Sequence, residues 1–221
     1  TDDGGYFAMG LDRDKRKIDG IGSNMAHCLW TGIVDEEKAA AVAATLVAPD
    51  MFTGWGIRTL SNRVHCYNPL SYHCGSVWPH DNAIAAAGLM RYGFVDEAHL
   101  VMLGLVETSA WFGDLLPELF SGMSRTDIGF PVPYPTSCSP QAWAAAAPLL
   151  FLRTMLRFEP DFRHSNLHLA PAIPPWIGRL RLERIPVMEG HLTIEVEGET
   201  VHALEVPEGI DIVGEPRSPT R

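Results

Sequence analysis

The sequence predicts a mainly α-helical protein that ends in a small β module. Alanine-rich segments with almost entirely apolar faces alternate with short links and with long loops rich in aromatic residues. Helices that are apolar all round are buried on both sides, as in one layer of a barrel or toroid of helix pairs. After Pro160, apolar and polar residues alternate with the period of two that is typical of strands. We therefore expect a helical domain over residues 1–160 and a β-rich domain over residues 161–221.

The N-terminal part predicts a short hairpin and two helices. Residues 6–20 alternate loosely around a charged turn, which favours a hairpin. A first helix is expected over 25–33. A second is expected over 36–47, because acidic residues fill its first turn and a proline follows its end. The connection 51–77 is long and dense in glycine, asparagine and aromatic residues, and loops of this length are usually functional.

Three more helices are expected before the β module. The third covers 78–93, with Pro79 suited to its first turn. The fourth covers 96–113, and the alanine-rich fifth covers 141–158. Between these last two lies a polar and aromatic connection, 114–140, that we expect to face the same end as the earlier loop.

The composition excludes several classes of partner. The 221 residues, 46% of them hydrophobic, suffice for a packed core. A net charge of -10 offers no basic surface for nucleic acid or anionic lipid. The longest apolar runs are shorter than the roughly 20 residues that a membrane span needs. The four cysteines lack metal-binding spacing, which predicts free thiols, a cytoplasmic location and no metal site.

The stretch YNPLSYHCGSVWPHDN, residues 67–82, gathers aromatic rings and hydrogen-bonding groups without core periodicity. Side chains with an apolar face and a polar edge suit a flat, hydroxylated ligand such as a sugar. Each of these aromatic residues could also simply anchor its loop to the core. The candidates for stacking on sugar rings are Trp55, Tyr67, Tyr72, Trp78 and Trp111. The candidates for binding hydroxyl groups are Arg58, His73, His80 and Gln141.

Two carboxylates complete the predicted chemistry. Glu118, between Pro117 and apolar residues, and Asp81, in WPHDN, could work as the acid and base pair that glycoside hydrolysis requires. Either could instead be a first-turn acid that stabilises a helix N-terminus. Motifs of serine hydrolases, nucleotide-binding proteins and zinc peptidases are absent from the sequence.

Several motifs in order resemble the C-terminal part of the bacterial amylo-α-1,6-glucosidase family, the glucosidase domain of glycogen-debranching enzymes, and related (α/α)6-barrel glycosidases. They are SNMAHCLWTG at 23–32, GWGIRTLS at 54–61, YNPLSYHCGSVWPHDN at 67–82, LPELFSG at 116–122 and PTSCSPQAWAAAA at 135–147.

This resemblance implies part of an (α/α)6 toroid of the six-hairpin glycosidase type and inverting hydrolysis of α-1,6-glucosidic linkages in glycogen-like oligosaccharides, without a cofactor. Glu118 matches the glutamate that acts as catalytic base. Arg58, His80, Asp81 and Gln141 are expected to contact glucose hydroxyls.

The sequence lacks the Y-x-S-x-D-A-T segment from which the family's general acid is expected. One explanation is a C-terminal half that meets a missing N-terminal half or self-associates. Another is a reduced relative that uses a different acid, such as Asp81. A non-catalytic carbohydrate-binding or assembly module is the rival hypothesis, and a purely structural helical scaffold is the third.

Overall fold

The computed structural model describes residues 5–219, which form two compact units, residues 5–151 and 152–219. In this described part, five helices and three small sheets give 29% helix and 20% strand. The prediction of a mainly α-helical (α/α)6 toroid is therefore wrong, because long irregular connections and a strand-rich second unit take up much of the chain. The predicted domains, 1–160 and 161–221, stay a prediction, and their ends, 1–4 and 220–221, lie outside the described residues.

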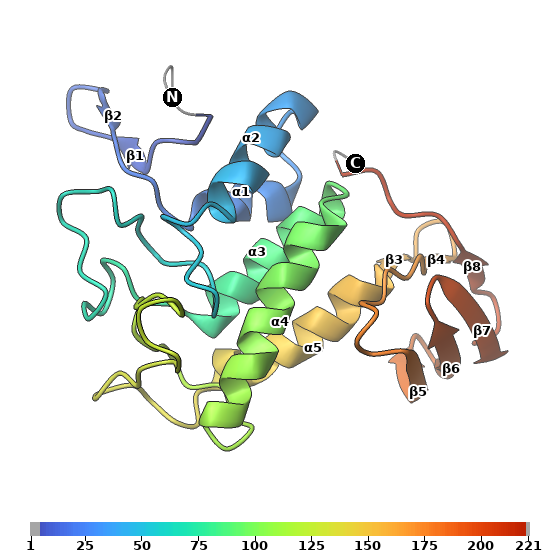
Figure 1. The fold of residues 1–221 in the computed structure, drawn as a ribbon. Helices are drawn as coiled ribbons and strands as arrows, with labels where there is room; N and C mark the ends of the chain where they lie inside the picture. The colour runs from blue at the N-terminus through green and yellow to red at the C-terminus, as the bar shows by residue number, and fades with distance from the viewer. Residues whose placement is uncertain (1–4, 220–221) are drawn as a thin grey trace. The chain divides into compact units, whose positions relative to one another are not determined.

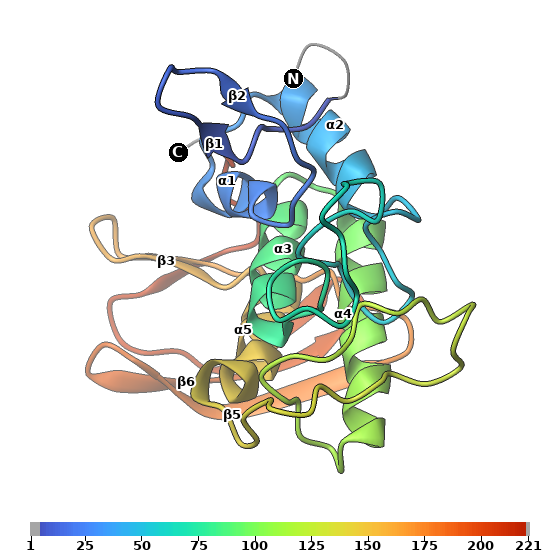
Figure 2. The ribbon, with the colours of Figure 1, turned by 90° about the vertical axis from the view of Figure 1, so that its left-hand side faces the viewer.

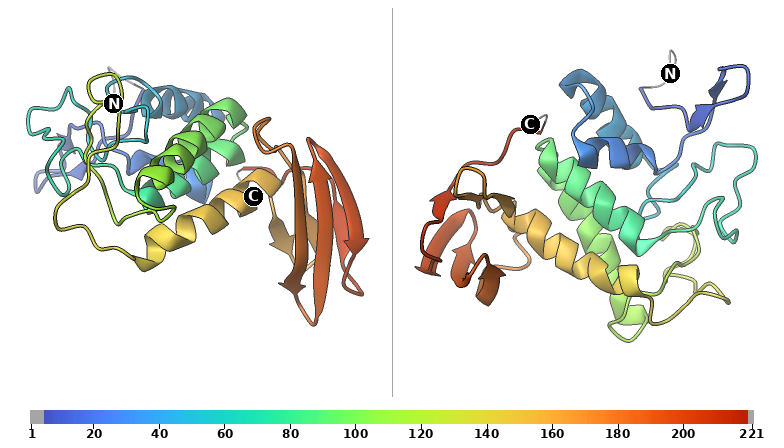
Figure 3. Two further views of the ribbon diagram at one scale, coloured as in Figure 1. Left: turned by 60° about the horizontal axis from the view of Figure 1, so that its bottom comes forward. Right: turned by 180° about the vertical axis from the view of Figure 1, so that it is seen from behind.

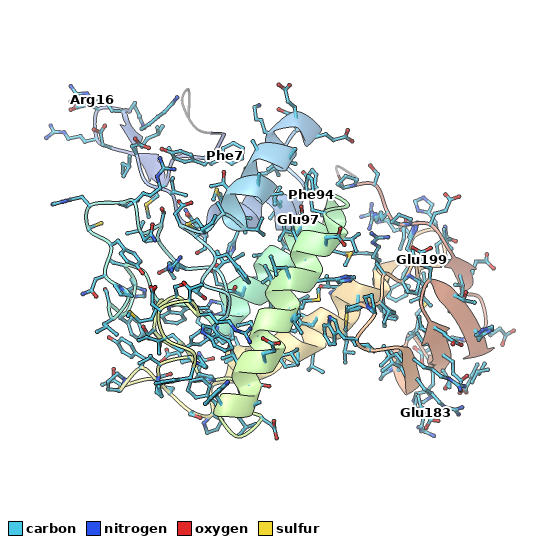
Figure 4. The ribbon with its side chains drawn as sticks, in the orientation of Figure 1. Phe7, Arg16, Phe94, Glu97, Glu183 and Glu199 are labelled. Atoms are coloured by element: carbon cyan, nitrogen blue, oxygen red, sulfur yellow. The ribbon has the colours of Figure 1, made fainter. Side chains whose placement is uncertain are left out.

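Figure 1 shows the elements in chain order. The helices are α1 (Met25–Thr31), α2 (Glu36–Leu46), α3 (Pro79–Arg91), α4 (Val95–Trp111) and α5 (Ala142–Leu156). The strands are β1 (Gly10–Leu11), β2 (Lys17–Ile18), β3 (Glu159–Asp161), β4 (Asn166–His168), β5 (Arg179–Val187), β6 (Gly190–Glu197), β7 (Thr200–Glu205) and β8 (Asp211–Val213). The five helices expected from the sequence are confirmed within a few residues, as is the hairpin β1–β2, with Arg16 near its tip (Figure 4).

The first unit is built around α3, which packs against α1 on one side and α4 on the other. Gly88 permits the close approach of α1, because a Cβ atom there would lie 2.8 Å from the Cβ of Leu29 and from the backbone nitrogen of Trp30. A tight turn reverses the chain between α3 and α4, and Phe94 and Glu97 mark the start of α4 (Figure 4). The N-terminal end of α3 and the C-terminal end of α4 therefore face the same way.

The two long connections of this unit, 47–78 and 112–141, lie on the same side of the helices (Figures 1 and 2). Isolated antiparallel bridges join them in a short ladder, with Val77 paired to both Arg58 and Phe120. Proline and glycine break up both segments, so that neither forms a helix. This ladder holds the loops in place without regular secondary structure.

Asn82 attaches the first of these loops to α3. Its side-chain oxygen accepts the Ile57 N–H at 2.6 Å, and its amide nitrogen donates to the Ile57 carbonyl at 3.1 Å and to the Trp78 carbonyl at 2.9 Å. The side chain is fully buried. A buried amide that satisfies three backbone groups fixes the loop firmly to the start of the helix.

The second unit carries an antiparallel sheet β5–β6–β7 and a sheet β3–β4–β8 in which β4 and β8 are parallel (Figure 3). Apolar side chains of β6 at 192, 194 and 196 are fully buried, whereas Glu183 on β5 and Glu199 in the turn between β6 and β7 are exposed (Figure 4). The predicted alternation is confirmed over the first half of β5, where exposed and less exposed residues alternate, whereas Thr193 between Leu192 and Ile194 of β6 is also buried. None of the described helices has both the length and the apolar character needed to cross a membrane.

Candidate functional site

Glu118 lies in the loop between α4 and α5 and is held by three hydrogen bonds. Its Oε1 accepts the Tyr72 hydroxyl at 2.6 Å, and its Oε2 accepts the backbone N–H of Cys138 at 3.1 Å. The Glu118 N–H donates to the Cys138 carbonyl at 3.0 Å. Only 9% of the residue is exposed, and the hydrogen bonds to both carboxylate oxygens fix their orientation.

These contacts set the charge of the site. The hydrogen bond from Tyr72, and after it the backbone N–H of Cys138, hold the pKa of Glu118 below its ordinary value. The same bond to the carboxylate, together with burial, raises the pKa of Tyr72 to about 12. Glu118 is therefore a carboxylate and Tyr72 a neutral donor throughout the physiological pH range.

Aromatic rings surround this pair. Tyr72 makes edge contacts with His73 at 4.6 Å, Trp78 at 4.9 Å and Tyr134 at 5.7 Å between ring centroids. The indole N–H of Trp78 donates to the Tyr72 carbonyl and to the hydroxyl of Ser76. The structure thus brings three predicted site residues, at 72, 73 and 78, together beside Glu118.

His80 and Trp143 extend this cluster. Their rings stack at 3.9 Å with an angle of 6° between the planes, and His80 also makes a T-shaped contact with Trp78 at 5.6 Å between ring centroids. Burial lowers the pKa of His80, and the nearby negative charges of Asp81 and Glu118 only partly oppose this effect. In the described part of the chain, the buried Nδ1 atom of His80 finds no hydrogen-bond partner. His80 is therefore a neutral ring close to both carboxylates.

Asp81, in the first turn of α3, faces a histidine of α1. Its Oδ1 lies 3.0 Å from Nε2 of His27, and the Asp81 side chain is 12% exposed whereas that of His27 is 43% exposed. The hydrogen bond to Asp81 raises the pKa of His27. Both residues lie at the N-terminal ends of their helices, where a negative charge is favoured.

Other predicted contacts lie inside the protein. Arg58 is 2% exposed, and its guanidinium donates to the carbonyls of Gly122 at 2.9 Å and Pro49 at 3.1 Å. The Tyr67 hydroxyl donates to the same Gly122 carbonyl at 3.1 Å. Trp55 is 2% exposed and lies under the guanidinium of Arg125. In this structure all three predicted residues support the loops, and their contact with a sugar stays a prediction.

Trp111 and Gln141 occupy the ends of helices. Trp111 is 58% exposed at the end of α4, where its ring lies 5.9 Å from that of Phe130 and outside the group of ring contacts beside Glu118. The side-chain oxygen of Gln141 accepts the Ala144 N–H at 2.9 Å, which caps the N-terminus of α5. The sugar contacts predicted for both residues stay predictions.

Sequence reasoning missed three contributors. Trp143 and His27 lie in segments whose motifs were recognised, but neither was singled out. Cys138 contributes through its backbone N–H and C=O, which residue type does not reveal. A tryptophan at the start of an apolar helix was the one signal that could have identified Trp143.

The described residues contain no group of three or more His, Cys, Asp and Glu side chains able to hold a metal ion. A groove of about 850 Å³ lies between α2 and the segments 19–21 and 63–65, and no predicted site residue lines it. We place the candidate site at Glu118, because the predicted site residues at 72, 73, 78 and 80 and the donors to Glu118 gather there.

Residues 1–115 match the family model described as "Mannosylglycerate hydrolase MGH1-like glycoside hydrolase domain". The match therefore covers Asp81, His27 and Tyr72 and ends three residues before Glu118. Among curated proteins no match is found.

Solved structures share the fold at low identity. The GH63 mannosylglycerate hydrolase from Thermus thermophilus in complex with glucose matches at a TM-score of 0.51 and 18% identity, over 63% of this chain and 32% of that chain. Neutral trehalase Nth1 from Saccharomyces cerevisiae matches at a TM-score of 0.51 and 16% identity, over 70% of this chain and 27% of that chain. A sialidase matches at a TM-score of 0.68 and 13% identity, over 88% of this chain and 20% of that chain.

The sialidase match extends beyond the first unit, since 88% of the chain is more than residues 5–151 can supply. It therefore agrees with a mixed helical and β architecture. The chain spans less than a third of the length of each of these three structures.

Proposed function

The chain belongs to the mannosylglycerate hydrolase MGH1-like glycoside hydrolase family, and from this premise we propose that it supplies the catalytic base and part of the sugar pocket of an inverting α-glycoside hydrolase. The observation that carries this proposal is the carboxylate of Glu118, fixed by two donors and kept ionised beside a cluster of aromatic rings. A base that activates water needs this charge state and a constant orientation. Aromatic rings beside a polar group are typical of sugar-binding pockets.

In the proposed reaction Glu118 removes a proton from a water molecule as the water oxygen attacks the anomeric carbon. The bond from that carbon to the glycosidic oxygen breaks, and a general acid gives its proton to the leaving oxygen. In inverting enzymes the two carboxyl groups are about 6.5–9.5 Å apart, which leaves room for the water. We propose that the acid comes from a part of the protein outside these residues, consistent with the share of the matched structures that the chain spans.

For the sugar itself, we propose contacts with three groups near the base. The exposed ring of His73 and the stacked pair of His80 and Trp143 offer flat surfaces next to Glu118. The carboxylate of Asp81 has one oxygen bound to His27 and can accept a sugar hydroxyl with its remaining lone pairs. Charged acceptors of this kind contribute strongly to the recognition of hydroxyl groups.

We propose α-1,6-glucosidic linkages of glycogen-like oligosaccharides as the substrate, on the resemblance of the segments around Glu118 and Asp81 to the debranching glucosidases. The match of residues 1–115 favours a second candidate, mannosylglycerate. The natural gene product should be assayed with a branched limit dextrin, mannosylglycerate and trehalose, with the released sugar and its anomeric form followed by NMR. Glucose released from the dextrin as the β-anomer supports the first candidate. Mannose released from mannosylglycerate in preference selects the second.

The role of Glu118 is tested by Glu118→Gln in the same protein. We expect kcat to fall by roughly 10²- to 10⁴-fold, because the amide cannot accept the proton from water. The change is nearly isosteric, so thermal unfolding should be little affected. Glu37→Gln, on the exposed first turn of α2, is the matched control and should keep full activity. Near-normal turnover of Glu118→Gln would exclude Glu118 as the base.

A further inference from the structure

We propose that Tyr72 is a positioning residue that orients the carboxylate of Glu118, and that it does not stack on the substrate. This inference rests on the proposed function for its effect on catalysis. Its structural basis is that two residues fix the two carboxylate oxygens of Glu118 from different parts of the chain. Tyr72 donates to Oε1 from the loop before α3, and Cys138 donates to Oε2 from the loop before α5.

Tyr72 is itself held in place. Its carbonyl accepts the Ser76 hydroxyl at 2.7 Å and the indole N–H of Trp78 at 3.1 Å. Its ring is packed by edge contacts with Trp78, His73 and Tyr134. A flat sugar needs an open ring face, whereas this ring is surrounded on several sides and its hydroxyl is committed to Glu118. A side chain held in this way transmits a fixed geometry to its partner.

The charged and titratable groups that face Glu118 also indicate that Tyr72 has the largest effect on its ionisation. Besides Tyr72, the thiol of Cys138 and the imidazole of His73 also lower the pKa of Glu118, and burial opposes them. The negative charge of Glu118 in turn opposes the lowering of the pKa of His80, and Tyr134 contributes to the raised pKa of Tyr72. The hydrogen bond from Tyr72 is the largest of the causes that lower the pKa of Glu118. Its removal should therefore change the titration of Glu118 more than any other single neutral substitution.

The test is Tyr72→Phe in the natural gene product, since phenylalanine keeps the ring and removes only the hydroxyl. The pKa of Glu118 should rise, so that the acidic limb of kcat/KM moves to higher pH. We expect kcat to fall by roughly 10- to 100-fold with KM nearly unchanged, because the base loses one fixed donor. Tyr134→Phe, which removes a neighbouring hydroxyl other than the one bonded to Glu118, is the matched control and should keep the acidic limb in place.

A direct titration separates this inference from the proposed function. The carboxyl carbon of Glu118 can be followed by ¹³C NMR against pH, with Glu118→Gln used to assign its signal. A higher pKa of Glu118 in Tyr72→Phe supports the positioning role even if Glu118→Gln turns out to be active, in which case only the catalytic role fails. An unchanged pKa of Glu118, or a raised KM with kcat and the acidic limb unchanged, would overturn the inference and make Tyr72 a sugar contact or a passive residue.

Discussion

The first unit holds two carboxylates that are equally buried, at 9% exposure each, but are supported by different kinds of partner. Glu118 sits in an irregular loop and receives hydrogen bonds from a phenol and a backbone N–H. Asp81 sits in the first turn of α3 and faces the imidazole of His27. Neither donor to Glu118 titrates near neutral pH, whereas imidazole does.

The difference shows how one unit provides a constant charge and a variable one. The largest causes that keep Glu118 ionised are two donors that do not titrate near neutral pH, which suits a base that must work over a broad pH range. The Asp81 and His27 pair changes its net charge as the histidine titrates. We therefore expect the Glu118 region to respond to changes in geometry and the Asp81 region to respond to changes in pH.

The largest expected effect comes from breaking the geometry of the Glu118 region with Gly122→Ala. A Cβ atom at Gly122 would lie 1.7 Å from the carbonyl oxygen of Gly75, a contact that forces the backbone of the two loops apart. The Gly122 carbonyl also anchors Arg58 and Tyr67. We expect activity to be lost and the free energy of unfolding to fall by about 3 kcal/mol, as for severe overpacking.

Urea unfolding and activity of the natural gene product measure this effect. Gly129→Ala is the control, because a Cβ atom there meets nothing within 4 Å. The NMR titration of His27 should stay the same in both variants, since the Asp81 region is supported separately by Asn82 and α3. If Gly122→Ala is as stable and active as Gly129→Ala, the loops do not depend on this close contact.

A smaller effect is expected when the charge of the second carboxylate is removed by Asp81→Asn. Loss of a charged acceptor should raise KM by roughly 10- to 100-fold if Asp81 binds a sugar hydroxyl. The acidic limb that reports Glu118 should not move. The pKa of His27 should fall, because its main raising cause is the hydrogen bond to Asp81.

Steady-state kinetics over a pH series, with a parallel NMR titration of His27, measure both changes. Asp96→Asn is the matched control, since Asp96 is also a first-turn acid and is exposed on α4. A raised KM in both variants would point to a general effect of helix charge. An unchanged KM in Asp81→Asn would remove Asp81 from the sugar pocket.

The sequence predicted the helices well because their determinants are local. The alanine-rich composition of α2, α3 and α5, and Pro79 in the first turn of α3, define these elements without tertiary information. The prediction of a mainly helical toroid was wrong because it extended the pattern of these helices to the whole chain. The loops and the strand-rich second unit are stabilised by contacts between distant residues, such as Val77 with Phe120, that periodicity does not reveal.

The sequence indicated which residues lie close together in the candidate site, but not the role of each one. Aromatic and polar residues at 72, 73, 78 and 80 do gather around Glu118. Residue type alone did not show that the hydroxyl of Tyr72 is bonded to Glu118 and that its ring has three aromatic neighbours. It also did not show that Arg58 is committed to two carbonyls inside the protein, because both acceptors are backbone atoms.

The smallest expected effect is a pH-dependent contribution of His27 to stability. The pKa of His27 is raised in the folded state, so the favourable contribution of its protonated form is fully present below its unfolded value, near 6.5. It is lost as the pH rises through the higher folded pKa. Because the His27 side chain is 43% exposed, we expect a contribution of at most about 1 kcal/mol.

His27→Gln tests this prediction and sharpens the contrast between the two carboxylates. The free energy of unfolding of the natural gene product and of the variant should differ most near pH 6 and least near pH 9, when measured in urea at both values. His65→Gln, an exposed histidine, should show no such trend. The acidic limb of activity should be the same in all three proteins, because the donors to Glu118 are untouched. If the difference in the free energy of unfolding instead grows toward pH 9, its pH dependence is the opposite of the one expected. His27 would then stabilise the fold as a neutral ring, and Asp81 would carry its charge without a cationic partner.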